Sequence, residues 1–213
     1  MIQSFRAASQ DPTGEPNPFS TRFVSPGMIA YKFDDELSPK KIANTFLTRR
    51  HQVAQIVGPH GSGKSTLLRS LFPHLRRNFE QIVEVNIRGS SSIDSVCLRG
   101  RQTGEKSELT EPRLLVVDGI ERLPLTSTIG LVGHCLFAGT GLLITTHRRS
   151  PVLPVLFETR PQLTVFQQIV HELQVHRSDK LITRDCCADV FQANKGDIRE
   201  SLMTLYDLWE DRR

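Results

Sequence analysis

Short apolar runs alternate with amphipathic stretches along most of this chain. Three runs have the length and the β-branched, aliphatic character of buried strands: 52–57, 81–88 and 114–118. A fourth, 142–146, follows an apolar stretch from which two glycines separate it. Strands that alternate with helical segments are typical of a parallel sheet. The pattern therefore predicts an α/β core.

The segments between and after these strands have helical spacing. Ser38 and Pro39 have the character of an N-cap and a first helical residue, so we expect an amphipathic helix before the first strand. Residues 162–166 suggest a fifth strand, and 167–175 a helix after it. We assign the strands and the helices that follow them to a core over residues 51–177, and the helix before the first strand to the extension 19–50.

Two predicted helices end the chain and form a small C-terminal unit, 178–213. The first covers 183–192 and stops at Gly196. Asp197 caps the second, and Glu200 three residues later completes a capping box. Apolar residues at helical spacing give this last helix one buried face. We expect the pair to form a lid on the core.

Three remaining segments differ in how many apolar residues they contain, and we expect different structures for them. Residues 1–18 contain three prolines and few apolar groups, so we expect a disordered tail. In the extension 19–50, four aromatic rings precede the amphipathic helix, which favours a segment packed on the core. The stretch 89–113 is too polar for a core, so we expect an insertion loop that connects elements or contacts a partner.

Composition sets limits on location and partners. The 213 residues are 38% hydrophobic, enough for a sizeable core, and their net charge of +4 does not by itself indicate a nucleic-acid partner, which stays open. The cysteines lack C-x-x-C spacing and no signal peptide is expected, so we predict reduced thiols and a cytoplasmic protein. The uncharged stretch 129–146 is predicted to be a buried helix and strand rather than a membrane span, because two glycines divide it.

The stretch GPHGSGKST, residues 58–66, carries the clearest chemistry. It fits G-x-x-x-x-G-K-S/T and lies between a predicted strand and a predicted helix, as a phosphate-binding loop requires. Glycines let backbone N–H groups wrap closely around a triphosphate, and the start of a helix favours an anion. Lys64 would neutralise the β- and γ-phosphates, and Ser65 would offer its hydroxyl to Mg²⁺. The expected nucleotide-binding residues of the loop are Gly58, Pro59, His60, Gly61, Ser62, Gly63, Lys64, Ser65 and Thr66.

The run LLVVD supplies two acidic candidates. A buried strand that ends in Asp118 presents a carboxylate at the carboxyl edge of a parallel sheet, where the loop also opens. Asp118 is therefore a candidate Mg²⁺ ligand together with Ser65, with a turn before Gly119 as the alternative. Glu121 is a candidate to orient or deprotonate an attacking water, or else a solvated residue beside Arg122.

Two more residues are candidates for contacts with the γ-phosphate. Thr146, and after it Thr145, ends the strand 142–146 with a hydroxyl, although β-branched residues also favour strands for structural reasons alone. Arg199 lies in the first turn of the last helix, where a cation opposes the helix dipole. Its position indicates an anionic target such as the nucleotide, with an ordinary surface ion pair as the alternative.

Taken in order, these motifs resemble those of P-loop ATPases of the additional-strand class, and within it the AAA+ and STAND-like groups. GPHGSGKST matches Walker A, LLVVDGIE is similar to a Walker B strand, LLITTH to a sensor-1 strand, and GDIRESL to a lid helix with a sensor-2 arginine. The resemblance implies ATP as the nucleotide and a three-layer P-loop NTPase core with a parallel five-stranded sheet and a small C-terminal helical lid. It also implies that the sensor strand lies between the P-loop and Walker B strands.

One departure from the family pattern concerns catalysis. AAA+ proteins usually carry Asp-Glu after Walker B, whereas Gly119 follows Asp118 here and the nearest acid is Glu121, a pattern closer to STAND-type ATPases. The lid is also shorter than the usual AAA+ bundle, so a ring hexamer is not implied.

We expect an ATP-binding, Mg²⁺-dependent ATPase that works as a conformational switch. Its catalytic residues would be Lys64, Glu121 and Thr146. Its partner would be another protein or a second copy of the chain, and no membrane is expected. A small-molecule or nucleoside kinase and a non-hydrolysing, nucleotide-dependent interaction module are the alternatives.

Overall fold

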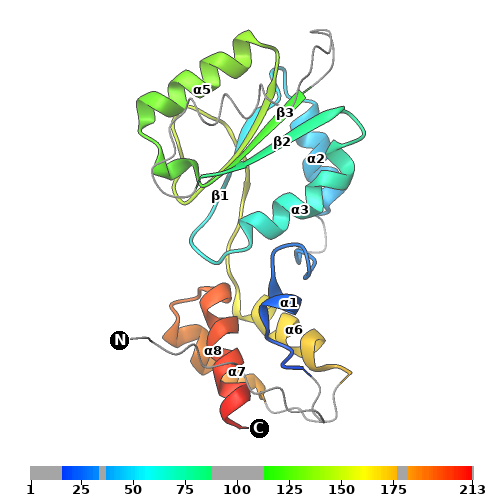
Figure 1. Cartoon of the computed structure of the whole chain (residues 1–213), viewed down its shortest axis with the longest axis vertical. Helices are drawn as coiled ribbons and strands as arrows, with labels where there is room; N and C mark the ends of the chain where they lie inside the picture. The colour runs from blue at the N-terminus through cyan, green and yellow to red at the C-terminus, as the bar shows by residue number, and fades with distance from the viewer. Residues whose placement is uncertain (1–15, 34–36, 88–112, 177–181, 213) are drawn as a thin grey trace, which may run out of the picture.

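A five-stranded parallel sheet lies between helices in the upper part of the molecule as drawn in Figure 1. The computed structural model describes residues 16–33, 37–87, 113–176 and 182–212. The strand order is β2-β3-β4-β1-β5, so β4 lies between β1 and β3, as the family resemblance implied. The strands are β1 (Val53–Val57), β2 (Gln81–Asn86), β3 (Arg113–Asp118), β4 (Gly141–Thr146) and β5 (Val155–Glu158).

Helices cover both faces of this sheet and give the core three layers. α2 (Pro39–Leu47) and α3 (Lys64–Leu75) pack on one face, and α5 (Leu125–Phe137) packs on the other (Figure 1). Successive strand residues point to opposite faces, so Leu114 packs with α2 and α3 whereas Leu115 packs with α5. The predicted three-layer α/β fold is confirmed.

Two predicted helix caps are also confirmed. At the start of α2, Ser38 Oγ accepts a hydrogen bond of 3.2 Å from the backbone N–H of Lys41, and Pro39 fills the first helical position. At the start of α8 (Ile198–Asp211), Asp197 Oδ1 accepts one of 3.0 Å from the N–H of Glu200. In both cases the side chain satisfies a backbone donor that the helix leaves unpaired.

The expected fifth strand at 162–166 is wrong. These residues begin α6 (Leu163–Gln174), and the edge strand β5 lies upstream. Phe166, Ile169 and Val170 are buried at helical spacing. β5 has four residues, all half-buried, which is too short for a periodic signal.

α6, α7 (Arg184–Ala193) and α8 form a hydrophobic cluster of their own below the sheet (Figure 1). Phe166 of α6 packs there with residues of both later helices. We call these three helices the lid. The lid expected from the sequence began at 178, and the packing of α6 favours an earlier boundary, although the division into domains stays a prediction.

An N-terminal segment, 16–33, joins this cluster at one end. It contains the short helix α1 (Thr21–Val24). Phe19 is fully buried and meets Trp209 edge-to-face, with 5.8 Å between ring centroids. Asn17 is also buried, and its Nδ2 donates to Tyr206 O at 3.0 Å. Residues 16–18 therefore belong to the fold and not to a disordered tail, while 1–15 lie outside the described residues.

The other end of this segment packs on the core. The ring of Tyr31 lies edge-on to Phe33 at 4.8 Å and to Phe157 of β5 at 6.1 Å, measured between centroids. The segment expected to pack on the core thus contacts both the lid and the core.

Some expectations fall at the limits of the described chain. The insertion loop 89–113 lies outside it except for Arg113, which begins β3. The stretch 129–146 forms most of α5 and all of β4, as predicted. Among the described helices, none is long and apolar enough to cross a bilayer. Cys97 lies outside the description, and the three cysteines within it, Cys135, Cys186 and Cys187, are free thiols.

Candidate functional site

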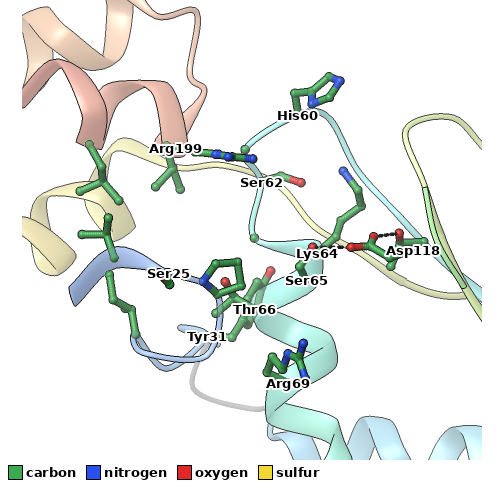
Figure 2. Close-up of a pocket in the computed structure, with 18 of the residues that line it drawn as sticks. Ser25, Tyr31, His60, Ser62, Lys64, Ser65, Thr66, Arg69, Asp118 and Arg199 are labelled. Carbon is green, nitrogen blue, oxygen red and sulfur yellow. Dashed lines mark hydrogen bonds between the residues drawn. The ribbon is translucent and has the colours of Figure 1, made fainter. Parts of the chain in front are cut away.

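The loop 58–63 joins β1 to α3 at the carboxyl edge of the sheet (Figure 2). Gly63 has a φ of 86° and is the N-cap residue of α3, so the helix begins at Lys64, as predicted. Gly61 has a φ of 60°. Both angles lie in the left-handed region that favours glycine. The start of α3 therefore faces the hollow of the loop.

Lys64 is folded back over this loop. Its Nζ donates to the carbonyl oxygens of Gly58 and Pro59, each at 2.7 Å, and the residue is only 8% exposed. Burial lowers the pKa of Lys64, while the carboxylates of Glu121 and Asp118 oppose that shift. The ammonium group thus lies between the loop and the acidic residues of the site.

Thr159 contacts the glycine loop and helps to hold its conformation. Its Oγ1 lies 2.7 Å from Ser62 Oγ, and its N–H donates to Val57 O at 2.8 Å. A Cβ on Gly58 would lie 1.9 Å from Thr159 Oγ1 and 2.7 Å from the Thr159 carbonyl oxygen. Glycine is therefore required at 58 by the close approach of Thr159, the residue after β5. Because the Ser62 hydroxyl also donates to Pro59 O at 2.8 Å, it is committed to the loop itself.

Ser65 and Asp118 meet where α3 begins and β3 ends. Ser65 Oγ donates to Asp118 Oδ2 at 3.0 Å (Figure 2). Asn86 Nδ2 lies 3.4 Å from the same oxygen, and Thr145 Oγ1 donates to Oδ1. A carboxylate beside a hydroxyl forms the set of hard oxygen ligands that Mg²⁺ prefers. The residues present therefore fit such an ion.

Thr145, and not Thr146, is the threonine of β4 that reaches this carboxylate. Thr145 Oγ1 also accepts a hydrogen bond of 3.2 Å from the N–H of Gly119. Thr146 Oγ1 instead donates to Arg148 O at 2.8 Å. Neighbouring strand residues point to opposite faces, so only one of the two can face Asp118. Thr145 also lines the cleft, and the γ-phosphate contact expected of Thr146 stays a prediction.

Gly119 turns the chain back after β3. It has a φ of 86° and precedes the single turn η1 (Ile120–Arg122). The turn brings Glu121 to the cleft, where its Oε1 lies 2.7 Å from His147 Nε2. An acid is therefore present in the cleft even though none directly follows Asp118.

His147 was not among the predicted site residues. It follows β4, and its ring centroid lies 3.8 Å from that of His60 in the loop. Burial and then the charge of Lys64 lower the pKa of His147, while Glu121 opposes the shift. The lowered pKa favours the neutral form of this imidazole at neutral pH.

The lid forms the opposite side of the site. Asp197 lies against the loop, since a Cβ on Gly61 would lie 1.7 Å from Asp197 Oδ1. Figure 2 shows Arg199 pointing from α8 toward the segment that carries His60 and Ser62. Arg199 is exposed, and within the described chain no hydrogen bond or ion pair holds its guanidinium group.

The core, the lid and the N-terminal segment together line a cleft of about 1270 Å³. Its polar part includes the loop, Asp118, Glu121 and Arg199. Its apolar side chains come from the lid and the N-terminal segment: Val24, Ile29, Tyr31, Phe33, Val165, Ile169, Ile198, Leu202 and Met203. This mixed lining suits a ligand with a charged end and a flat, largely apolar part.

Sequence reasoning missed four residues of the site. His147 follows the strand predicted at 142–146, and Asn86, inside the strand predicted at 81–88, ends β2. A polar residue near the carboxyl end of a strand was a usable signal. Thr159 follows a strand that was not predicted, and Tyr31 reaches the loop only through the path of the N-terminal segment. No local pattern marks the last two.

No protein-family model matches this sequence, and no curated protein is significantly similar to it. Among solved structures, that of C. elegans PCH-2 is similar, with 15% sequence identity and a TM-score of 0.42. The match covers 69% of this chain and 48% of that one, so this chain spans about half the length of the C. elegans protein. A likeness at this level carries no functional conclusion.

Proposed function

We propose that this chain binds ATP with Mg²⁺ and hydrolyses it, and that hydrolysis drives a conformational switch of the lid. The observation that carries the proposal is the Ser65–Asp118 contact of 3.0 Å beside the glycine loop and Lys64. The position of β4 between β1 and β3 adds support, because it is the order expected of additional-strand ATPases.

Phosphate binding would fall to the loop and the start of α3. Backbone N–H groups at a helix N-terminus are suited to phosphate oxygens. Lys64 Nζ would exchange its bonds to Gly58 O and Pro59 O for phosphate oxygens. Ser65 and Asp118 would hold Mg²⁺, which when bound would stabilise negative charge on the phosphates.

Glu121 is our candidate for the residue that receives the proton of the attacking water. It lines the same cleft as Lys64 and Asp118. Thr145 and Asn86, through their contacts with Asp118, would keep that carboxylate oriented. Positioning and electrostatic stabilisation are the main contributions a protein makes to phosphoryl transfer, and a base for the attacking water adds to them.

The lid would convert hydrolysis into motion. Arg199 is exposed and points toward the loop, so it can bind a phosphate without breaking an existing ion pair (Figure 2). When the γ-phosphate leaves, this contact is lost and the lid equilibrium shifts. The moving surface would be sensed by a protein partner or by a second copy of the chain.

The test measures ATP binding and phosphate release for the wild type, Lys64→Ala and the control Lys40→Ala, which changes an exposed lysine of α2. We expect Lys64→Ala to lower turnover by about 100-fold or more and Lys40→Ala to match the wild type. ATP recovered intact would support the interaction module, and transfer to an acceptor faster than to water would support the kinase. A wild type that binds no ATP contradicts the proposal.

A further inference from the structure

Three side chains from separate segments meet at one side of the cleft. His60 comes from the glycine loop, Glu121 from the turn after β3, and His147 from the end of β4. Glu121 Oε1 lies 2.7 Å from His147 Nε2, and the side chains of Glu121 and His147 are 28% and 24% exposed. They are partly shielded, unlike an ordinary surface ion pair.

Of the two residues Glu121 and His147, His147 is held more rigidly by its surroundings. It directly follows a central strand whose six residues are all buried. Its ring also packs against that of His60, with an angle of 43° between the ring planes. Glu121 belongs to a single turn of three residues and has a long side chain, whose freedom is costly to restrict. A bond to the fixed imidazole therefore limits where the carboxylate can go.

We propose that His147 is a positioning residue, which donates its Nε2–H to Glu121 Oε1 and leaves Oε2 to accept the proton of the attacking water. The inference rests on the proposed ATPase function and assigns it a residue beyond those of the P-loop and Walker B motifs. His60 contributes by holding the imidazole ring. The role is analogous to that of carboxylates and carbonyls that orient catalytic side chains elsewhere.

The protonation state of His147 matters for this arrangement. A neutral imidazole donates one hydrogen bond and leaves Glu121 basic, whereas an imidazolium would stabilise the Glu121 carboxylate and make it a weaker base. Burial lowers the pKa of His147, and so do the positive charges of Lys64, His60 and Arg122. The carboxylate of Glu121 raises it. Hydrolysis is therefore expected to fall on the acid side, below the ordinary histidine range near pH 6.5.

The kinetic test compares the full chain with His147→Ala and His147→Gln, whose amide can replace the Nε2–H donor. We expect His147→Ala to lower kcat by about 10- to 100-fold, with KM and the ATP dissociation constant changed by less than about threefold. His147→Gln should recover part of kcat. In its pH profile, the fall of kcat at acid pH that protonation of His147 causes should be absent. His134→Ala, at an exposed position of α5, is the matched control and should equal the wild type.

A second readout does not depend on activity. The pKa of His147 is measured by NMR titration in the full chain without nucleotide, for the wild type, Glu121→Gln and His60→Ala. Glu121→Gln should lower that pKa and His60→Ala should raise it, because the two groups act on it in opposite directions.

The outcomes separate the two proposals. An active enzyme in which His147→Ala keeps the wild-type kcat overturns this inference alone, as does a His147 pKa that Glu121→Gln leaves unchanged. A wild type that binds ATP without hydrolysing it overturns the proposed ATPase and the role of His147 with it.

Discussion

The two sides of the cleft are built in different ways. On the core side, Ser65, Asp118 and Thr145 lie at the ends of buried elements and are joined by hydrogen bonds. On the lid side, Arg199 is exposed, and contact with the loop is made by Asp197 against Gly61. Groups that must place charge accurately benefit from rigid support, whereas groups that respond to a ligand come from loosely held regions. The comparison is consistent with our proposal, in which the core side carries out the chemistry and the lid moves.

The largest effect is expected from Gly58→Ala, which disrupts the glycine loop on the core side of the cleft. The new Cβ would meet the Thr159 backbone as well as its hydroxyl, and a carbonyl oxygen cannot retreat as a flexible side chain can. We expect overpacking to lower the free energy of unfolding by about 1–3 kcal/mol, and distortion of the loop to lower ATP affinity.

Gly133→Ala is the matched control for this substitution. Nothing lies within 4 Å of a Cβ on Gly133, which is inside α5. Alanine should raise the free energy of unfolding by about 0.5–1 kcal/mol there. Chemical denaturation and ATP titration of both variants make the comparison, and equal stability of Gly58→Ala and the wild type would contradict the assigned role of Thr159.

Asp118→Asn should act on chemistry with little effect on the fold. The amide keeps the shape of the carboxylate but removes the charge that would hold Mg²⁺. We expect kcat to fall by about 100-fold, within the range for loss of an electrostatic catalytic group. Phosphate release across a Mg²⁺ titration measures this. Asp189→Asn, at an exposed position of α7, is the control, and an Asp118→Asn enzyme with normal turnover would place the metal elsewhere.

The smallest effect is expected from Arg199→Ala on the lid side. Because the guanidinium is exposed, its attraction for a phosphate is screened. We expect ATP affinity to fall by about 3- to 10-fold at low salt and less at high salt, with stability unchanged. Calorimetric titration at two salt concentrations checks both. Arg184→Ala serves as a control from α7, and an equal loss in that variant would show a general charge effect.

Much of the fold could be predicted because its signals are local. β1 to β4 are short apolar runs, and the caps of α2 and α8 are side chains with a direct structural role. β5 and the start of α6 were mispredicted for a physical reason, whereas the rest of α6 lies in the helix expected at 167–175. A short, half-buried edge strand lacks periodicity, and the β-branched and aromatic residues at the start of α6 fit a strand equally well until tertiary packing decides.

The same distinction between local signals and tertiary packing applies to the residues of the site. Lys64, Ser65 and Asp118 could be placed because a motif or a strand end fixes them. The choice between Thr145 and Thr146 depends on which face of β4 meets Asp118, and the sequence of the strand does not show that. The contact of Asp197 with Gly61 joins residues far apart in the chain.

The packing of Phe19 on Trp209 gives the lid a built-in optical probe. Trp209 is the single tryptophan of the chain and is 3% exposed within the lid cluster. Its emission therefore reports solvent entry into that cluster, while far-ultraviolet circular dichroism reports the whole chain. Melting curves recorded by the two signals, with and without ATP, would show whether lid and core lose their structure together or in succession, and no label would be needed.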